Sequence, residues 1–326
     1  MSMHGSSNGA KGRFRPTLSN LELRSPPLPQ TLVEAMDLIN QPDQLEMEPV
    51  TTMVERDPIV VARLLQIVNS AYYGLQRSID SVERAVVMLG PVAVTGIVMG
   101  MNMLKLRSAL EGPASRLYLR LIRHSIATAF LTRHLIEGPP RLHTPRRKTK
   151  NIGASFTAGL LHDFGKIILV YNYPDDAVEL YERQTYDQQI LSGDMRGLEQ
   201  LLFGCDHTEA GEYVARKLGF PDALTEVIRL HHDFDRDTGE ESTNRLLRAT
   251  AAANMMAKAI GYSFTHKVSW DHCRNHALWD EIITTDLPQF ETSDALLAEL
   301  DAEREHLDYY VQNLTSTTLS GVKDLG

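Results

Sequence analysis

The sequence predicts an all-α protein with two packed helical lobes and a C-terminal helix. Three observations predict it: apolar residues recur at helical spacing through most of the chain, capping residues and prolines introduce these segments, and no alternating strand pattern longer than about four residues lies between glycine or proline breaks. With 326 residues, of which 43% are hydrophobic, the chain is long enough to bury a sizeable core.

The first part of the chain predicts an N-terminal helical lobe over residues 21–110. It follows a polar, glycine-rich stretch, residues 1–20, which we expect to be a disordered tail. Prolines and acidic caps mark the helix starts, because proline suits the first turn and an Asp side chain accepts the unpaired N–H groups there. The expected helices are 31–40, one with Pro49 in its first turn, one opened by Asp57 and Pro58, one opened by the capping-box pair Asp80 and Glu83, and one from Pro91 through Met103.

Gly112 and Pro113 mark the clearest internal boundary, and a second lobe is expected over residues 115–265. Its expected helices are 115–136, 156–171, one that ends near residue 191, 207–220, one that ends at the doublet His231–His232, and 245–261. Residues 266–326 form a C-terminal helical extension in this division. Its last helix begins at Ser293 and carries leucines at helical spacing up to Leu314, a pattern that suits either docking on the domain or self-association.

Composition excludes several classes of function. The two cysteines, Cys205 and Cys273, have no CxxC spacing, so neither a disulfide framework nor a thiolate zinc site is expected. The net charge of -9 argues against broad nucleic-acid binding, which needs a basic surface. The N-terminus has no apolar core for a signal peptide, and the apolar run at 97–104 is too short to span a bilayer. We therefore expect a cytoplasmic protein that does not enter a membrane.

A basic loop is expected between the helices at 115–136 and 156–171. It contains five cationic residues and no acidic one, and these are Arg141, Arg146, Arg147, Lys148 and Lys150. Such a run is usually a solvated loop, and a specific role in anion or nucleic-acid binding is the alternative.

The stretch 156–171, FTAGLLHDFGKIILVY, carries the most chemistry in the chain. If it forms one helix, apolar side chains fill one arc and Gly159, His162, Asp163 and Lys166 fill another. Adjacent His and Asp side chains diverge by about 100° on a helix, which allows both to hold one ion, and the glycine leaves space for an ion or a phosphate. The alternative is a buried ion pair between Asp163 and Lys166 beside a hydrogen-bonded core histidine.

Further histidines lie on inward faces of other expected helices. His124 and His207 each share a face with small and apolar residues, and His231 lies in register with apolar residues of its helix, beside His232. A single histidine on an apolar face is usually a core residue. Several such helices beside a His-Asp pair favour a metal site, because imidazole and carboxylate are the usual ligands for zinc, manganese or iron in a helical bundle.

The order of these residues resembles the HD superfamily of metal-dependent phosphohydrolases, and more closely its HDOD branch. The HD pattern is a first His, the His-Asp pair, one or more further His, and a late Asp; the candidates fall in that order, with Asn254 in the last place. The HDOD resemblance covers about residues 21–262 and rests on the phrases PPLPQT, ERDPIVVARLLQIVNSAYYG, SIDSVERAVVMLG, TAGLLHDFGK and DHTEAGEYVARKLGFPDALTEVIRLHH.

The resemblance implies a role in bacterial signal transduction, as a regulatory or protein-interaction module with a degenerate HD pocket. Signalling proteins would be its partners, and a nucleotide ligand and a homodimer are further expectations. The alternative is a metal-dependent phosphohydrolase that acts on a nucleotide or a cyclic dinucleotide, with Lys166 in a catalytic role that steadies the phosphate charge. The metal, as Fe, Mn, Zn or Mg, would be held by His124, His162, Asp163, His207, His231 and His232.

Two departures from an active phosphodiesterase weigh against catalysis. Asn254 replaces the late Asp, and an amide is a far weaker ligand than a carboxylate; the doublet His231–His232 is followed by DFDRD in place of a Gly-Tyr-Pro stretch. Asp163 is then the only carboxylate that we can place among the ligands. We therefore expect one ion or none, with little or no turnover of cyclic dinucleotides.

Overall fold

The computed structural model describes residues 23, 30–40, 46–69, 75–138, 152–183, 195–264 and 269–315. Across these ranges the chain forms helices joined by turns, with no strand, so the predicted all-α class is confirmed. The expected tail at 1–20 and the basic stretch at 141–150 lie outside the described residues.

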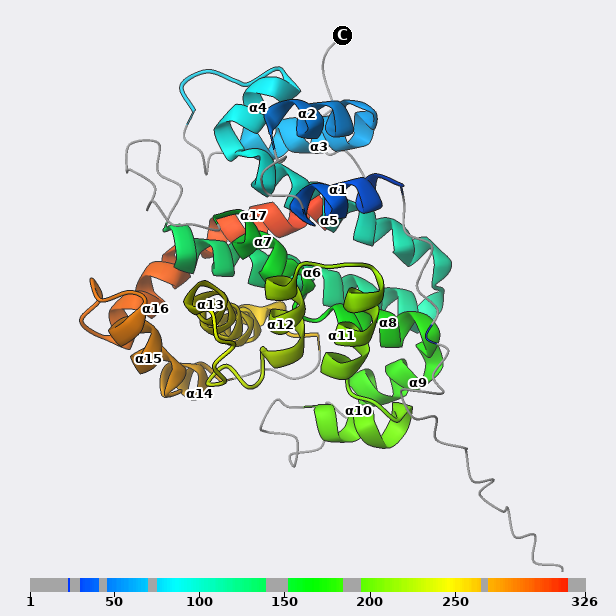
Figure 1. The fold of residues 1–326 in the computed structure, drawn as a ribbon, viewed down its shortest axis with the longest axis vertical. Helices are drawn as coiled ribbons and strands as arrows, with labels where there is room; N and C mark the ends of the chain where they lie inside the picture. Colours follow the sequence, from blue (N-terminus) through cyan, green and yellow to red (C-terminus); the bar gives the residue numbers. More distant parts are fainter. Residues whose placement is uncertain are drawn as a thin grey trace, which may run out of the picture.

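Five helices form the N-terminal lobe, at the top of Figure 1. They are α1 (Gln30–Asn40), α2 (Met47–Glu55), α3 (Pro58–Val68), α4 (Val82–Leu89) and α5 (Pro91–Lys105). Asp57 caps α3 as predicted, because its side chain accepts the N–H groups of Ile59 and Val60. The predicted cap of α4 is wrong by one residue: the Ser81 hydroxyl accepts the N–H of Arg84.

The second lobe contains the longest helix and most of the candidate residues. Its elements are α6 (Gly112–Glu137), α7 (Ile152–Leu161), α8 (Phe164–Asn172), α9 (Pro174–Val178), α10 (Arg196–Phe203), α11 (His207–Lys217), α12 (Asp222–Leu230) and α13 (Glu241–Ala257). The C-terminal part adds α14 (Trp270–Arg274), α15 (Leu278–Thr285), α16 (Ser293–Ala302) and α17 (Arg304–Thr315). Helices α10, α14 and α15 were not expected from the sequence.

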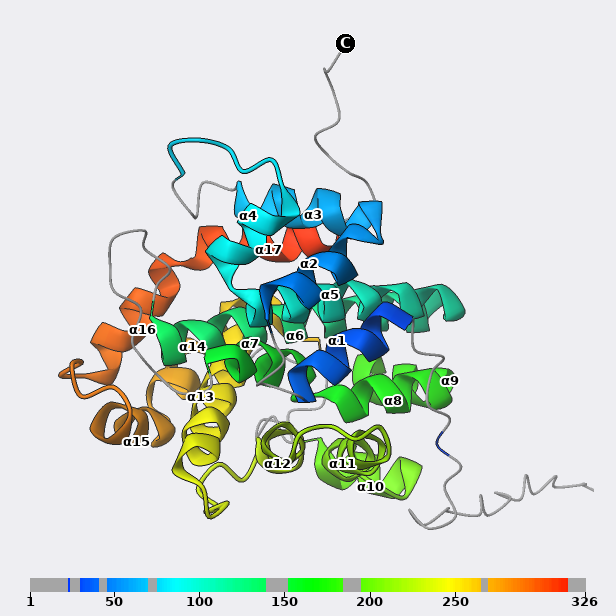
Figure 2. The same ribbon diagram turned by 45° about the horizontal axis from the view of Figure 1, so that its top comes forward.

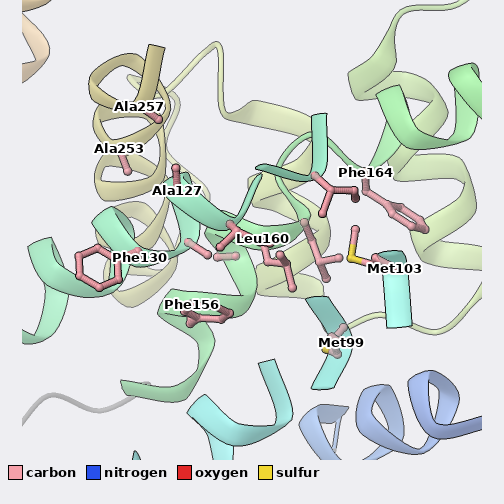
Figure 3. Close-up of a cluster of buried hydrophobic side chains, with 14 of the residues drawn as sticks. Met99, Met103, Ala127, Phe130, Phe156, Leu160, Phe164, Ala253 and Ala257 are labelled. Atoms are coloured by element: carbon pink, nitrogen blue, oxygen red, sulfur yellow. The ribbon is translucent and has the colours of Figure 1, made fainter. Parts of the chain in front are cut away.

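The core is continuous between the two lobes because α6 runs through the middle of the molecule and contacts α5, α7, α8, α13 and α17 (Figures 1 and 2). Figure 3 shows this meeting point, where apolar side chains from α5, α6, α7, α8 and α13 lie together. The labelled residues are Met99 and Met103 from α5, Ala127 and Phe130 from α6, Phe156 and Leu160 from α7, Phe164 from α8, and Ala253 and Ala257 from α13.

Helix α17 docks on the domain, which is one of the two arrangements that the sequence pattern suits. Helix α17 contacts α3, α5 and α6, so it touches both lobes. Its Leu307, Tyr310, Val311 and Leu314 are buried. The expected single helix from Ser293 is wrong, because the chain turns between α16 and α17 so that α16 packs on α14 and α15 while α17 packs on α6.

No single helix among the described residues is long and apolar enough to cross a membrane. One pair, residues 82–89 together with 93–109, meets that requirement of length and composition jointly, although the two helices are bent by 111°.

Candidate metal centre

The His-Asp pair lies in a turn, so the expectation of one helix over 156–171 is wrong. Helix α7 ends at Leu161 and α8 begins at Phe164. Asp163 has φ −96° and ψ 23°, and its carbonyl oxygen accepts the N–H of Lys166 at 2.9 Å. The apolar period of the sequence continues across this turn, which is why periodicity alone did not detect it.

Gly159 has a packing role that differs from the predicted one. A Cβ built on it would lie 2.6 Å from the Cα of Ala129 and 2.7 Å from the hydroxyl oxygen of Thr132. The space beside Gly159 is therefore filled by α6, and no ion or phosphate fits there. The glycine is needed because α7 and α6 cross at close range.

Asp163 lies at the centre of four imidazole rings. Its Oδ2 is 3.6 Å from Nε2 of His124 and 3.3 Å from Nε2 of His162. Its Oδ1 is 3.6 Å from Nε2 of His207 and 3.4 Å from Nε2 of His231. All five side chains are buried, so the structure brings together residues that are up to 107 positions apart, from His124 to His231, around one carboxylate.

Each ring comes from a different element. His124 lies in the middle of α6, and His162 lies in the turn between α7 and α8. His207 is the first residue of α11, and His231 directly follows α12. The start of α11 is set by a capping box, in which the Asp206 carboxylate accepts the N–H of Glu209 and the Glu209 carboxylate accepts that of Asp206.

The same hydrogen-bond pattern orients all four rings. In each ring Nδ1 faces an oxygen that can only accept, so Nδ1 carries the hydrogen and Nε2 keeps its lone pair. The acceptors are the carbonyl oxygens of Tyr262 for His124 at 2.9 Å, Gly159 for His162 at 2.8 Å and Ile228 for His231 at 3.0 Å, and the carboxylate of Glu199 for His207 at 2.5 Å.

The lone pairs of His207 and His231 face each other without a shared proton. Nε2 of His207 is 3.3 Å from Nε2 of His231 and 3.1 Å from Nε2 of His232. Buried polar atoms normally have partners, yet Nε2 of His124, Nε2 of His162 and Oδ2 of Asp163 have none. A cation would satisfy the whole set, because every free atom in it is an electron-pair donor.

The donor set fits a divalent metal. Asp163, His207, His231 and His232 form one group of candidate ligands, and His124, His162 and Asp163 form a second. Within each group the ligand atoms lie within 4.8 Å of one another. Neutral imidazoles with one bridging carboxylate suit a first-row transition ion better than Mg²⁺, which prefers oxygen ligands.

Burial sets the protonation states that metal binding needs. Burial lowers the pKa of His231 to about 3, and burial also lowers the pKa of His124 well below its ordinary value. Both rings are therefore neutral at pH 7. Burial alone would raise the pKa of Asp163, but the ammonium of Lys166 holds it well below its ordinary value, so the carboxylate is ionised.

Lys166 is paired with the central carboxylate and does not face solvent. Its Nζ donates to Oδ1 of Asp163 at 2.8 Å, it is 3% exposed, and it lies 4.8 Å from the centroid of the Phe264 ring. The buried ion pair between Asp163 and Lys166, which the sequence suggested as an alternative to a metal site, is therefore present. It lies beside the four histidines, so the two interpretations do not exclude each other.

Sequence reasoning missed Glu199. Its Oε2 accepts from Nδ1 and from the main-chain N–H of His207, and its Oε1 accepts from the hydroxyl of Tyr181 at 2.7 Å. A signal was available: Met195, Glu199 and Phe203 are spaced four residues apart, so an acidic residue occupies the buried face of a short amphipathic helix, α10.

Comparisons with known proteins identify the family and the fold of the chain. A family model described as HDOD domain matches residues 25–234. An uncharacterised protein of Treponema pallidum (strain Nichols) is 24% identical over 235 residues, which are 72% of this chain and 42% of that protein. The chain thus spans less than half the length of the curated relative that it matches.

Solved structures share the fold. An HDOD domain protein of unknown function from Geobacter sulfurreducens has a TM-score of 0.68 at 21% identity and covers 89% of this chain and 93% of its own. A protein from Marinobacter aquaeolei VT8, assigned provisionally to signal transduction, has a TM-score of 0.62 at 20% identity. The match covers 93% of this chain and 62% of that protein. A protein from Shewanella amazonensis SB2B, assigned provisionally as a phosphohydrolase, has a TM-score of 0.59 at 21% identity. The match covers 89% of this chain and 95% of that protein.

Proposed function

The chain belongs to the HDOD domain family, and from this premise we propose that it is a regulatory module of signal transduction whose buried His-Asp cluster binds a divalent metal. One observation carries the proposal: four imidazoles are each held at Nδ1 so that their Nε2 lone pairs surround Asp163. A histidine that only fills a core has no need of this shared orientation. Output then passes through contacts with signalling proteins.

The proposal includes the division of the chain that the sequence predicts. Residues 21–265 form the HDOD domain, made of lobes 21–110 and 115–265, and residues 266–326 form the extension. The metal centre lies wholly in the second lobe. The continuous packing through α6 gives the first lobe a mechanical connection to it.

One ion is proposed to bind more tightly than a second. His207, His231, His232 and Asp163 supply four donors for the first, and His124 and His162 with a shared Asp163 supply fewer for the second. Among the described residues, Asp163 is the only carboxylate in either group, because Glu199 contacts the far side of His207. Two close dications need more negative charge than one carboxylate provides.

The second candidate function is a metal-dependent phosphohydrolase. It is favoured by the two ligand groups that share Asp163, an arrangement suited to a phosphate ester, and by the cation Lys166 beside them. A metal bound here would polarise a phosphate oxygen and acidify a water molecule. Lys166 would offset the charge on Asp163, and the buried walls would exclude other water from the ester.

Elemental analysis tests the metal. Protein purified without added metal, and then with manganese, iron or zinc, should retain up to one ion per chain. Asp163→Ala should remove it, whereas Asp80→Ala, at a carboxylate that is 78% exposed, should not. Equal metal content in the wild type and Asp163→Ala would contradict the proposal.

An activity assay separates the two functions. The regulatory module should show little hydrolysis of cyclic dinucleotides with added manganese, and Asn254→Asp should raise it by supplying a further carboxylate. If the unmodified protein already hydrolyses them and Asp163→Ala abolishes this, the phosphohydrolase is the correct function.

A further inference from the structure

The ring of His124 is supported from beyond the residues that the family model matches. Its Nδ1 donates to the carbonyl oxygen of Tyr262 at 2.9 Å, and the ring of Phe264 packs on it at 5.5 Å between centroids. Both supports follow residue 234, where the match to the family ends. The C-terminal part of this chain therefore reaches one of the four rings that surround Asp163.

Tyr262 also contacts α17. Its hydroxyl donates to the carboxylate of Asp308 in that helix. Burial and this carboxylate raise the pKa of Tyr262, so the hydroxyl keeps its hydrogen at pH 7 and remains a donor. One residue thus joins a candidate metal ligand, through its carbonyl oxygen, to α17, through its hydroxyl.

The position of the Tyr262 carbonyl depends on tertiary contacts. Gly261 has a φ of 108°, which favours glycine, so the chain leaves its helical path directly before Tyr262. The short helical segment that contains both residues, Lys258–Tyr262, follows α13 and packs against α6, which carries His124. No substitution removes a main-chain carbonyl, but loss of the hydroxyl contact leaves the residue free to shift it.

Helix α17 is held by the first lobe as well. It lies against α3, α5 and α6 (Figures 1 and 2). Arg63 of α3 donates to the main-chain carbonyl of Asn313 at 2.7 Å, and both residues are buried. Arg123, which precedes His124 in α6, donates to the hydroxyl of Thr315 at 3.3 Å. A hydrogen bond from a charged group is stronger than one between neutral groups, so the contact with Arg63 holds α17 firmly.

We propose that α17 connects the first lobe to the metal centre, with Asp308 and Tyr262 as positioning residues for the ring of His124. A change in the first lobe that moves α17 then changes the orientation of this ligand. Metal bound at His124 in turn tightens α17 on the first lobe, because coupling between two sites is reciprocal. The inference rests on the proposed function and deepens it by naming the route between metal and first lobe.

NMR of metal-free protein with ¹⁵N-labelled histidine tests the positioning. The signals of His124, identified by their loss in His124→Gln, report the hydrogen bond at Nδ1. Tyr262→Phe keeps the ring and the carbonyl but removes the hydroxyl, so it should shift these signals as that hydrogen bond changes. Tyr309→Phe, the same change at an exposed side chain of α17, should leave them in place.

Asp308 allows a graded comparison. Asp308→Asn keeps an oxygen that can accept from the Tyr262 hydroxyl, whereas Asp308→Ala removes it. The alanine variant should therefore shift the His124 signals as Tyr262→Phe does, and the asparagine variant should shift them less. The double variant of Asp308→Ala and Tyr262→Phe should match each single one, because both remove the same bond. Shifts that add would contradict a joint action.

Arg63 tests the part played by the first lobe. Arg63→Met keeps a long side chain but removes the donor to Asn313, and it should shift the His124 signals in the same direction as Tyr262→Phe. Arg84→Met, at a side chain of α4 that is 69% exposed, is the control. If Arg63→Met does not fold by circular dichroism, Arg63→Lys, which loses the guanidinium geometry, replaces it. Unmoved His124 signals in the folded Arg63 variant would overturn the connection.

Metal titration by calorimetry separates this inference from the proposed function. Tyr262→Phe should weaken the ion held by His124, His162 and Asp163 by about three- to tenfold, less than the loss of a direct partner costs. It should leave the other ion unchanged, because His124 is not in that ligand group. A wild type that binds no metal while the variants shift the His124 signals contradicts only the proposed function. A wild type that binds metal while no variant shifts these signals contradicts only the inference.

Discussion

At the scale of single residues, the candidate metal centre depends on the oxygen atoms that accept the Nδ1 hydrogens of its imidazoles. Each of four rings donates its Nδ1 hydrogen to an oxygen, and three of those oxygens belong to the main chain. Main-chain carbonyls cannot be removed by substitution. Glu199 is the exception, so it is the position at which ring orientation can be tested.

Glu199→Gln should lower metal affinity by roughly 10- to 100-fold, because the carboxylate that orients His207 and raises its basicity loses its charge. Tyr181→Phe should have a smaller effect, since its hydroxyl reaches only the second oxygen of Glu199. Metal titration measured by calorimetry gives both values. Glu241→Gln, at a side chain that is 71% exposed, is the matched control.

Acid should destabilise the metal-free protein through the buried histidines. His231 has a folded pKa of about 3 and an ordinary value of 6.5, so between these pH values the unfolded chain binds a proton that the folded chain does not. Stability from this group is therefore full above pH 6.5 and falls by up to about 1.4 kcal/mol per pH unit below it. The lowered pKa of Asp163 acts in the same direction at lower pH, below its ordinary value of 3.8.

Urea unfolding between pH 7.5 and 4.5 measures this slope. His231→Gln should make the slope shallower, because glutamine does not titrate. An identical pH dependence in the variant and the wild type would show that His231 is not the source.

The sequence allowed the inward histidines to be predicted but not their supports. His124, His207 and His231 each lie in register with apolar neighbours, so helical periodicity placed them inside. Glu199 acts through His207 from an unexpected helix, and no local pattern links the two. Main-chain acceptors such as the carbonyl of Tyr262 leave no mark in a sequence.

At the scale of elements, two glycines set the crossing of α8 and α11. A Cβ on Gly165 would lie 1.7 Å from the carbonyl oxygen of His207, and a Cβ on Gly211 would lie 3.0 Å from the main-chain nitrogen of Gly165. The close approach of these backbones brings the first residue of α11 to the His-Asp turn. It therefore positions His207 beside Asp163.

Gly165→Ala should lower the free energy of unfolding by about 1–3 kcal/mol or more and reduce metal binding, because the helices must separate. Gly197→Ala, in α10, is the control: no atom lies within 4 Å of the added carbon, so it should be neutral or stabilise by up to about 1 kcal/mol. Chemical denaturation and metal titration of both variants make the comparison. A wild-type-like Gly165→Ala would contradict the tight crossing.

Helix existence was easier to predict than helix ends. Proline and capping chemistry placed α3 and α11 correctly, since those signals are local. The turn at His162–Asp163 and the turn before α17 carry no glycine or proline, so periodicity predicted continuous helices in both places. What bends the chain there is packing against distant helices.

At the scale of the whole molecule, α17 joins the two lobes. It lies against α3 and α5 of the first lobe and α6 of the second. Arg63 on α3 also donates to the carbonyl oxygen of Asn313 at 2.7 Å. The two lobes should therefore unfold together in spite of the boundary that the sequence suggests near Gly112.

Leu314→Ala should lower the free energy of unfolding by about 2–5 kcal/mol while unfolding remains a single transition. The residue is 3% exposed, so its removal leaves a cavity between the lobes. Leu201→Ala, at a side chain that is 56% exposed, should cost far less. Two separate transitions by calorimetry and fluorescence would argue that the lobes are independent.

The facing lone pairs of His207 and His231 should also affect the lifetime of the protein in a cell. Without a cation they oppose folding, and with one they favour it by an amount that grows with the logarithm of free metal over its dissociation constant. Starvation for the ion should therefore enlarge the unfolded fraction that proteases degrade. The abundance of this chain would then follow the supply of the metal, and a pulse-chase measurement under chelation, with Asp163→Ala as an unresponsive comparison, would reveal it.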